Sequence, residues 1–354
     1  MTIAPRWRLL AHVLLMCAMG LLCLYSAVHQ RNPELVLRQL YWVGLGVVVF
    51  WAVARVNYYR WLDGAYLAYA LTLLLLIAMP WVGRTTMGAS RWIDIGGFSV
   101  QPSELAKLAT ILTLARYLGH VARARGSLTW SRIVGALVIS AAPALLIFKQ
   151  PDLGSATIFA VVTLGMLWVA GASRRQIAML LAIGLISLPV GWHLLQPYQR
   201  ARLLVFVNPN VDPLGAGYTI IQSKIAIGSG GVFGKGWLAG TQNQLNFLPE
   251  RHTDFIFSVI GEEWGFVGSM MIVALLGWLV WRGAEIARRS QDRVGRLIAT
   301  GVVTALGYQS VVNIGMVSGM LPVVGLPLPF VSYGGSSLVT TFLAVGLLEN
   351  VRRA

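Results

Sequence analysis

Ten apolar runs, most of them long enough to cross the hydrocarbon of a bilayer, constrain this chain more than any other feature. Crossing about 30 Å takes roughly 20 apolar residues in a helix, and fewer where neighbouring helices bury the ends. Because no water reaches the backbone there, each run has to satisfy its own polar groups, as a helix does. We therefore predict an all-α polytopic membrane protein with spans near residues 9–28, 39–56, 62–82, 104–119, 133–149, 153–171, 176–196, 255–281, 295–318 and 329–349.

The composition agrees with a single membrane domain covering residues 1–354. Only 12% of the residues are charged and 56% are hydrophobic, whereas soluble domains carry about 25% charged residues. The net charge of +15 is spread between the apolar runs, which favours anionic lipid and membrane topology over a nucleic-acid partner. Cys17 and Cys23 lie in the first apolar run, where their expected role is packing. That run lacks a small-residue cleavage pattern, so we interpret it as an uncleaved span.

The distribution of basic residues predicts the orientation. With the N-terminus inside, 17 of the 28 Lys and Arg residues fall on the inner side. The outer side has 11, of which five lie in one long loop that the rule for short loops does not cover. We therefore expect both termini to be cytoplasmic and the long loop, residues 196–263, to face outward.

This long loop is the one extended segment that is neither apolar nor a simple turn. Structureless loops above about 15 residues are uncommon unless they are functional or disordered, and its aromatic residues and glycines argue against disorder. Residues 218–227 have a nearly helical apolar period, which predicts an interfacial amphipathic helix carrying Lys224. The glycine-rich segment 228–236 contains Lys235, and such a segment can bring backbone N–H groups to phosphate, but it does not fit the P-loop pattern.

Charged residues also stand at the start of the fourth span. Pro102 or Ser103 is expected at a helix cap, with Glu104 in the first turn. Lys107 is three residues further on, so Glu104 and Lys107 can form an ordinary i,i+3 ion pair. The alternative is that Arg91 and Lys107 form a cationic pair for an anionic substrate, because charges at the edge of hydrocarbon are costly. The residues alone leave both interpretations open.

Two aspartates precede other spans. Asp152 is expected to cap the sixth span, or to accompany a nearby cation. Asp254 is expected either to cap the eighth span or to act as a general base, since desolvation raises the pKa of a carboxyl and the neighbouring Arg251 and His252 keep it ionised. The last outer connection, within residues 313–337, has three prolines at membrane depth. Such backbone survives where protein buries it or water lines it, which predicts a cavity open to the outer face.

The motifs in these connections resemble the SEDS family of membrane proteins, and within it the branch that acts in cell elongation and rod shape rather than in division. They occur in one order along nearly the whole chain: RWIDIGGFSVQPSELAK at 91–107, QPDLGSA at 150–156, NP-x2-DP-x-GAGY at 208–218, QSKIAIGSGGVFGKG at 222–236, FLPERHTDFIFSVIGEEWGFVG at 247–268 and N-x5-GMLPVVGLPLPFVSYGGSS at 313–337. The resemblance implies ten spans and a glycosyltransferase. The expected reaction is polymerisation of lipid II at the outer face of the inner membrane, with release of undecaprenyl diphosphate.

The resemblance also implies residue roles and partners. It assigns the essential aspartate to Asp254 and functional charges to Arg91, Glu104 and Lys107. A class B penicillin-binding protein, which is a transpeptidase, and other components of an elongation complex are the expected partners. No organic cofactor is expected, and a divalent cation such as Mg²⁺ or Mn²⁺ could shield the diphosphate, although no ligand cluster is visible in the sequence. The remaining candidate substrate-binding residues are Asp152, Arg202, Lys224, Lys235 and His252.

Three alternatives stay open. A flippase for lipid-linked sugar would need polar residues along a path through both leaflets, whereas the charges here concentrate at the outer ends. A scaffold for the transpeptidase would not need Asp254. A division-specific relative would perform the same chemistry in another complex.

Overall fold

The computed structural model describes residues 8–86, 89–95, 98–119, 128–215, 217–245 and 247–353. Each predicted span coincides with helical structure, so the prediction of a polytopic, mostly helical protein is confirmed. Within the described residues, eight helices are long and apolar enough to cross a membrane. The count of ten spans therefore stays a prediction. Arg6, Arg123 and Arg125, which contribute to the predicted orientation, lie outside the described residues.

The chain divides into two compact units. The first comprises Met1–Gly46, Pro197–Val280 and Gln309–Thr341, and the second comprises Val47–Gln196, Trp281–Tyr308 and Phe342–Ala354. Four helices contain a division point: α2 (Glu34–Arg55), α13 (Gly265–Arg289), α14 (Arg293–Val317) and α15 (Gly335–Arg353). This division into two units does not test the prediction of a single membrane domain, which stays a prediction.

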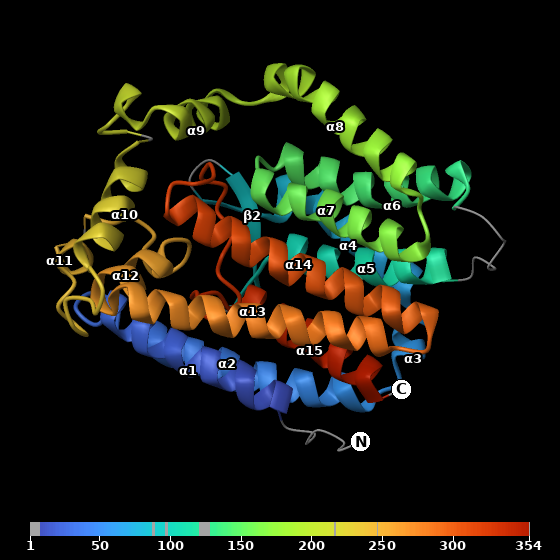
Figure 1. The fold of residues 1–354 in the computed structure, drawn as a ribbon, viewed down its shortest axis with the longest axis horizontal. Helices are drawn as coiled ribbons and strands as arrows, with labels where there is room; N and C mark the ends of the chain where they lie inside the picture. Colours follow the sequence, from blue (N-terminus) through green and yellow to red (C-terminus); the bar gives the residue numbers. More distant parts are fainter. Residues whose placement is uncertain are drawn as a thin grey trace. The chain divides into compact units, whose positions relative to one another are not determined.

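The second unit is built around one central helix. α5 packs on α4, α6 and α7, and the core between them contains Leu76, Ala106, Ile147 and Phe159 (Figure 1). Because neighbours surround it, α5 tolerates polar residues that a lipid-facing helix would expose. This explains why it is not among the eight apolar spans. The elements that lie wholly in this unit are α3 (Tyr58–Asp63), α4 (Ala65–Val82), β1 (Arg84–Thr86), β2 (Ala89–Ile95), β3 (Phe98–Val100), α5 (Pro102–Gly119), α6 (Trp130–Lys149), α7 (Leu153–Ala170) and α8 (Arg174–Leu194).

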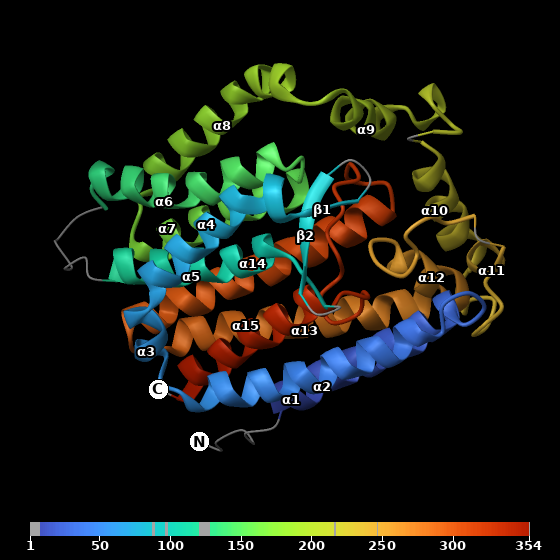
Figure 2. The same cartoon turned by 180° about the vertical axis from the view of Figure 1, so that it is seen from behind.

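A small antiparallel sheet precedes α5, in a stretch for which the sequence predicted no strand. Its order is β1-β2-β3, with Arg84 opposite Trp92 and Ile93 opposite Val100; β1 and β2 are visible in Figure 2. Two of the strands have only three residues, and runs this short give little period-two signal. The sheet matters because β2 carries Arg91.

Local signals set the ends of α7 and α8. Asp152 is the N-cap of α7, and Gly171, at φ +106°, ends that helix in the left-handed conformation that glycine adopts without strain. Ser173 and Gln176 then form a capping box at the start of α8. No part of the apolar window of α8 is buried inside the protein, so its side chains are available to lipid.

The first unit contains the long loop, which is largely helical. α10 is the amphipathic helix expected near residues 218–227, and it packs against α11 and α12 (Figure 1). α1 also contacts α12. The elements that lie wholly in this unit are α1 (Arg8–Val28), α9 (Pro197–Val207), the 3₁₀ helix η1 (Pro209–Val211), α10 (Tyr218–Ser229), α11 (Thr241–Gln244) and α12 (Ile256–Glu263).

The eighth predicted span is not one continuous helix. It breaks between α12 and α13 at Gly265, which has φ +65°. A Cβ on Gly265 would lie 2.3 Å from the backbone nitrogen of Gly234, so only glycine allows this approach. Phe266 N–H donates to the Gly231 carbonyl at 2.9 Å, and Lys235 N–H donates to the Glu262 carbonyl at 3.0 Å. The glycine-rich segment thus packs its backbone against the helix break.

Candidate functional site

Asp254 lies in the turn immediately before α12. The N-cap of α12 is Phe255, so neither Thr253 nor Asp254 has the capping position that the sequence left open. The Asp254 side chain is half-buried, and its Oδ2 faces Gly325, where an added Cβ would lie 3.2 Å away. The carboxylate therefore lies against the backbone of the 318–334 connection.

The same connection touches Lys224. This exposed lysine of α10 extends over Gly319, where an added Cβ would lie 1.9 Å from Cε and 2.6 Å from Nζ. Gly319 and Gly325 have φ of +73° and +72°, a region that favours glycine. Two predicted site residues thus lie along one irregular segment, and each lies beside a glycine.

His252 belongs to the same turn as Asp254, and its ring lies near Tyr333. Its ring centroid is 5.9 Å from that of Tyr333, whose N–H donates to the His252 carbonyl at 2.9 Å. Burial lowers the pKa of the imidazole below its ordinary value, and Arg251 lowers it further while Glu250 opposes the shift. The lowered pKa weakens the support for a charged His252 beside Asp254, and its role at the site stays a prediction.

Arg91 and Asp152 meet at one turn of the second unit. The Arg91 guanidinium donates from Nε to the Gln150 carbonyl at 3.2 Å and from Nη2 to the Pro151 carbonyl. The Asp152 carboxylate accepts from the backbone N–H of Ser155 at 3.0 Å and from its hydroxyl at 2.8 Å. The capping role predicted for Asp152 is confirmed. By donating to the Gln150 and Pro151 carbonyls, Arg91 stabilises the turn that precedes Asp152.

Glu104 and Lys107 form the predicted ion pair. Lys107 Nζ lies 2.7 Å from Glu104 Oε1, and the two side chains are only 8% and 4% exposed. α5 begins at Pro102, so Glu104 is in the first turn as expected. A buried pair is weak evidence for stability, because desolvation offsets its attraction. The presence of this buried pair on the central helix agrees with the alternative that Lys107 binds an anionic substrate.

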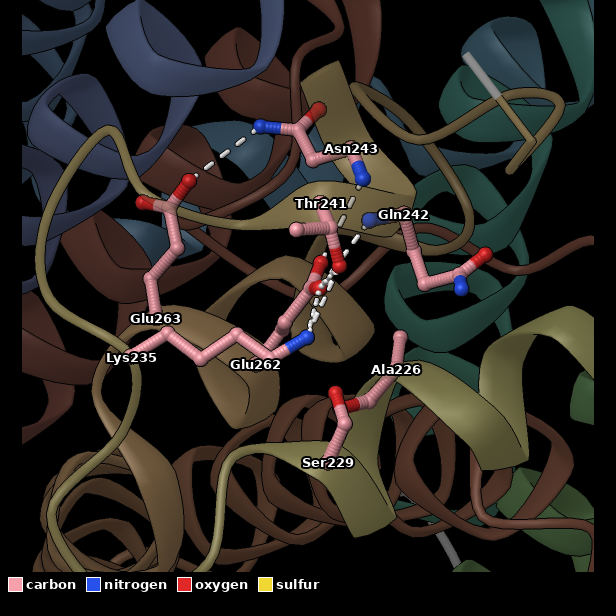
Figure 3. Close-up of polar contacts among 8 residues, drawn as sticks. All are labelled: Ala226, Ser229, Lys235, Thr241, Gln242, Asn243, Glu262 and Glu263. Carbon is pink, nitrogen blue, oxygen red and sulfur yellow. Dashed lines mark hydrogen bonds and ion pairs between the residues drawn. The ribbon is translucent and has the colours of Figure 1, made fainter. Parts of the chain in front are cut away.

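Lys235 lies in a hydrogen-bond network at the end of α12 (Figure 3). Its ammonium is 2.8 Å from Glu262 Oε1 and 2.8 Å from the Thr241 hydroxyl. The Glu262 carboxylate, fully buried, also accepts from the backbone N–H groups of Gln242 at 3.0 Å and Asn243 at 3.3 Å, in the first turn of α11. Lys235 thus has internal partners, and its contact with substrate stays a prediction.

The adjacent Glu263 joins this network to α1. Its Oε1 accepts from the Ser26 hydroxyl at 2.5 Å and from Asn243 Nδ2 at 3.3 Å (Figure 3 shows the second of these bonds). Arg202, by contrast, is exposed on α9, with its guanidinium 5.8 Å from the ring centroid of Tyr198. Its proposed contact with substrate has no structural test.

Metal binding by the protein alone finds no support in the part of the chain that the structure describes. Among those residues, no group of three or more His, Cys, Asp or Glu side chains is arranged to hold an ion. A divalent cation would need ligands from the substrate as well.

Two residues of the motif at 313–337, to which the sequence assigned no individual role, hold the Asp254 turn in place. Asn313 donates from Nδ2 to the Asp254 carbonyl at 2.9 Å, and the Ser332 hydroxyl donates to the Thr253 carbonyl at 2.6 Å. The available signal was an amide near the C-terminal end of an apolar helix, α14.

Comparisons with known proteins agree on one family. The family model for FtsW, RodA and SpoVE, described as cell cycle proteins, matches residues 6–354. The peptidoglycan glycosyltransferase MrdB of Escherichia coli K12 is 44% identical over 315 residues, covering 89% of this chain and 84% of MrdB. A probable peptidoglycan glycosyltransferase FtsW of Geobacter metallireducens is 43% identical over 318 residues, with the same shares covered.

A solved structure is similar over the full length. It was determined in work on the coordination of polymerization and crosslinking by a peptidoglycan synthase complex. The matching chain is 37% identical, with a TM-score of 0.83, and the match covers 99% of this chain and 98% of that one.

Proposed function

Because this chain belongs to the FtsW/RodA/SpoVE family, we propose that it is a peptidoglycan glycosyltransferase that polymerises lipid II into glycan strands. The observation that carries the mechanism is the half-buried carboxylate of Asp254, which lies against the 318–334 connection and is not an N-cap.

The reaction joins a sugar hydroxyl to the anomeric carbon of a diphosphate donor. The hydroxyl oxygen forms the new glycosidic bond, and the bond from the anomeric carbon to the phosphate oxygen breaks. The hydroxyl proton moves to the Asp254 carboxylate, and undecaprenyl diphosphate leaves with the bonding electrons. A single base suffices for direct displacement, which predicts inversion at the anomeric carbon.

The diphosphate leaving group needs positive charge. We assign this role to Arg91 and Lys107, since guanidinium and ammonium groups form strong charge-assisted hydrogen bonds to phosphate oxygens. In the absence of substrate, Lys107 Nζ is paired with the Glu104 carboxylate at 2.7 Å. A Mg²⁺ or Mn²⁺ ion bound to the diphosphate would add to this charge, since such ions commonly take part of their ligands from substrate phosphates.

The protein is a multi-pass membrane protein. We propose in addition that both termini are cytoplasmic and that Asp254 faces outward in the inner membrane, which the distribution of Lys and Arg supports. A class B penicillin-binding protein fits as the partner, because a structurally similar chain comes from a complex that couples polymerization to crosslinking.

The elongation assignment is a further step. The motifs favour the rod-shape branch of the family, but relatives named for each branch are almost equally identical to this chain, at 44% and 43%. Depletion of the protein in a rod-shaped host separates the branches. Loss of the elongation protein gives round cells, whereas loss of the division protein gives filaments.

A reconstituted polymerisation assay tests the enzymatic proposal against a flippase. Purified protein is incubated with labelled lipid II, with and without the transpeptidase partner, and products are resolved on a gel. Glycan polymer in either reaction supports the proposal. Transport of lipid II across vesicles without polymer under any condition would favour the flippase.

A further inference from the structure

The backbone that carries Asp254 is held by three hydrogen bonds to successive carbonyls. Tyr333 N–H donates to the His252 carbonyl at 2.9 Å, the Ser332 hydroxyl to the Thr253 carbonyl at 2.6 Å, and Asn313 Nδ2 to the Asp254 carbonyl at 2.9 Å. All three donors come from a stretch at least 59 residues away along the chain. These three bonds tie the turn before α12 to the end of α14 and to the connection that follows it.

Asn313 differs from the other two donors because it is a fully buried side chain on a membrane helix. Its exposed fraction is 0%, and its Nδ2 donates both to Asp254 and to the Leu326 carbonyl at 2.6 Å. Leu326 follows Gly325, the residue beside the Asp254 carboxylate. One amide therefore joins the Asp254 backbone to the segment that its carboxylate faces.

The amide is costly if it serves only folding. Its Oδ1 is buried and has no hydrogen-bond partner, and an unpaired buried acceptor costs about 1–3 kcal/mol. A side chain of similar shape without polar atoms would have no unpaired oxygen, but it would leave the Asp254 and Leu326 carbonyls without this donor. The Asn313 amide, unlike an apolar side chain, can fix the distance between the backbone at Asp254 and the backbone at Leu326.

We propose that Asn313 is a positioning residue for Asp254, an inference that rests on the proposed function. By holding the Asp254 carbonyl and the Leu326 carbonyl on one amide, it fixes where the carboxylate lies relative to the acceptor hydroxyl. A displacement of 1 Å in a catalytic group can cost about 10²-fold in rate. Loss of Asn313 should therefore lower turnover without weakening the binding of lipid II.

α14 supplies a matched control one turn earlier. Gln309 is 3% exposed, and its Nε2 donates to the Pro327 carbonyl at 2.8 Å. Gln309 and Asn313 thus hold neighbouring carbonyls of the same connection from the same helix. Asn313 makes a second bond from the same nitrogen, to the Asp254 carbonyl, and the comparison of the two residues measures the effect of that bond.

The test compares Asn313→Leu with Gln309→Leu in the polymerisation assay. Both changes replace a buried amide with an apolar side chain, so both should reduce thermal stability, and kcat is therefore compared per folded molecule. Asn313→Leu should lower kcat by about 10- to 100-fold with KM for lipid II unchanged, and Gln309→Leu should leave kcat near the wild-type value. Ser332→Ala, which removes the bond to the Thr253 carbonyl, provides a second variant should Asn313→Leu fail to fold. It should also lower kcat selectively.

Combination with Asp254→Asn makes the test specific. If Asn313 acts through the carboxylate, Asn313→Leu should have no further effect once Asp254 is Asn, because residues that act as a unit are not additive. Equal losses from Asn313→Leu and Gln309→Leu would reduce Asn313 to a structural role. An inactive Asp254→Asn together with a fully active Asn313→Leu overturns only this inference, whereas an active Asp254→Asn overturns the proposed base itself.

Discussion

The ion pair between the buried Glu262 and the partly exposed Lys235 should contribute more to stability than to catalysis. Glu262 is fully buried and accepts four hydrogen bonds, from Lys235, from the Thr241 hydroxyl and from two backbone N–H groups of α11. Glu262→Gln removes the negative charge and turns an NH₂ group toward these donors. Lys235→Met removes the cation and leaves the carboxylate buried.

The expected magnitude follows from burial. Breaking a buried ion pair by removing one partner costs about 3–5 kcal/mol, because the remaining charge is uncompensated. Lys235 is 27% exposed, so after Glu262→Gln its ammonium can turn to water, and we expect a loss of about 3 kcal/mol, at the low end of that range. Lys235→Met leaves a carboxylate with no exposure, although three donors still solvate it, and we expect a similar value. The double variant should cost about 1–3 kcal/mol less than the sum of the single variants.

Reversible unfolding of the purified protein in mixed micelles, titrated with SDS, measures these free energies. Ser229→Ala is a suitable control, since the Ser229 hydroxyl donates within α10, to the Ala226 carbonyl at 2.9 Å. Glycan synthesis per folded molecule should stay near wild type in Lys235→Met. If Lys235→Met keeps full stability and loses polymerisation, the lysine is a substrate ligand and the structural interpretation is refuted.

Three further predictions concern charge, orientation and pH. Arg91→Gln and Lys107→Gln should each lower polymerisation by about 10- to 100-fold, as expected for a charged hydrogen bond of ~1.5–3 kcal/mol, with normal membrane insertion. Full activity in Lys107→Gln would show that Lys107 does not bind the diphosphate and serves only in the ion pair with Glu104. Cysteine at the exposed Phe233 position should react with an impermeant thiol reagent in spheroplasts and cysteine at the exposed Gln291 position should not; the reverse would overturn the orientation. Because burial lowers the pKa of His252, its stabilising contribution should be complete above pH 6.5 and lost as the pH falls through the lowered value. The unfolding midpoint should drop less over that pH range in His252→Gln than in the wild type. If the midpoint depends on pH equally in both proteins, His252 is not the group responsible.

The sequence predicted the helices that depend on apolar length and local caps. α7 begins after Asp152 as expected, and α10 forms where the apolar period is helical. Both signals are local, within one or two turns. The sheet that carries Arg91 and the break at Gly265 were missed. The break depends on a backbone contact with Gly234, a long-range approach that periodicity does not encode.

The site was likewise predicted only in part, because local sequence signals reveal charged residues but not long-range contacts. Asp254, Arg91 and Lys107 were found because charges at membrane ends stand out in an apolar chain. Burial lowers the pKa of His252, and this burial cannot be inferred from its neighbours in sequence. The contact of Asn313 with Asp254 was not predicted, because it spans 59 residues.

The most direct test of the account is glycan synthesis by Asp254→Asn in the purified complex with its transpeptidase. The substitution keeps size and local polarity and removes the base. Folding and complex formation should remain normal, while polymerisation falls by roughly 10²–10⁴-fold, the usual share of a positioned acid or base. Wild-type polymerisation by the folded Asp254→Asn protein would contradict the catalytic assignment.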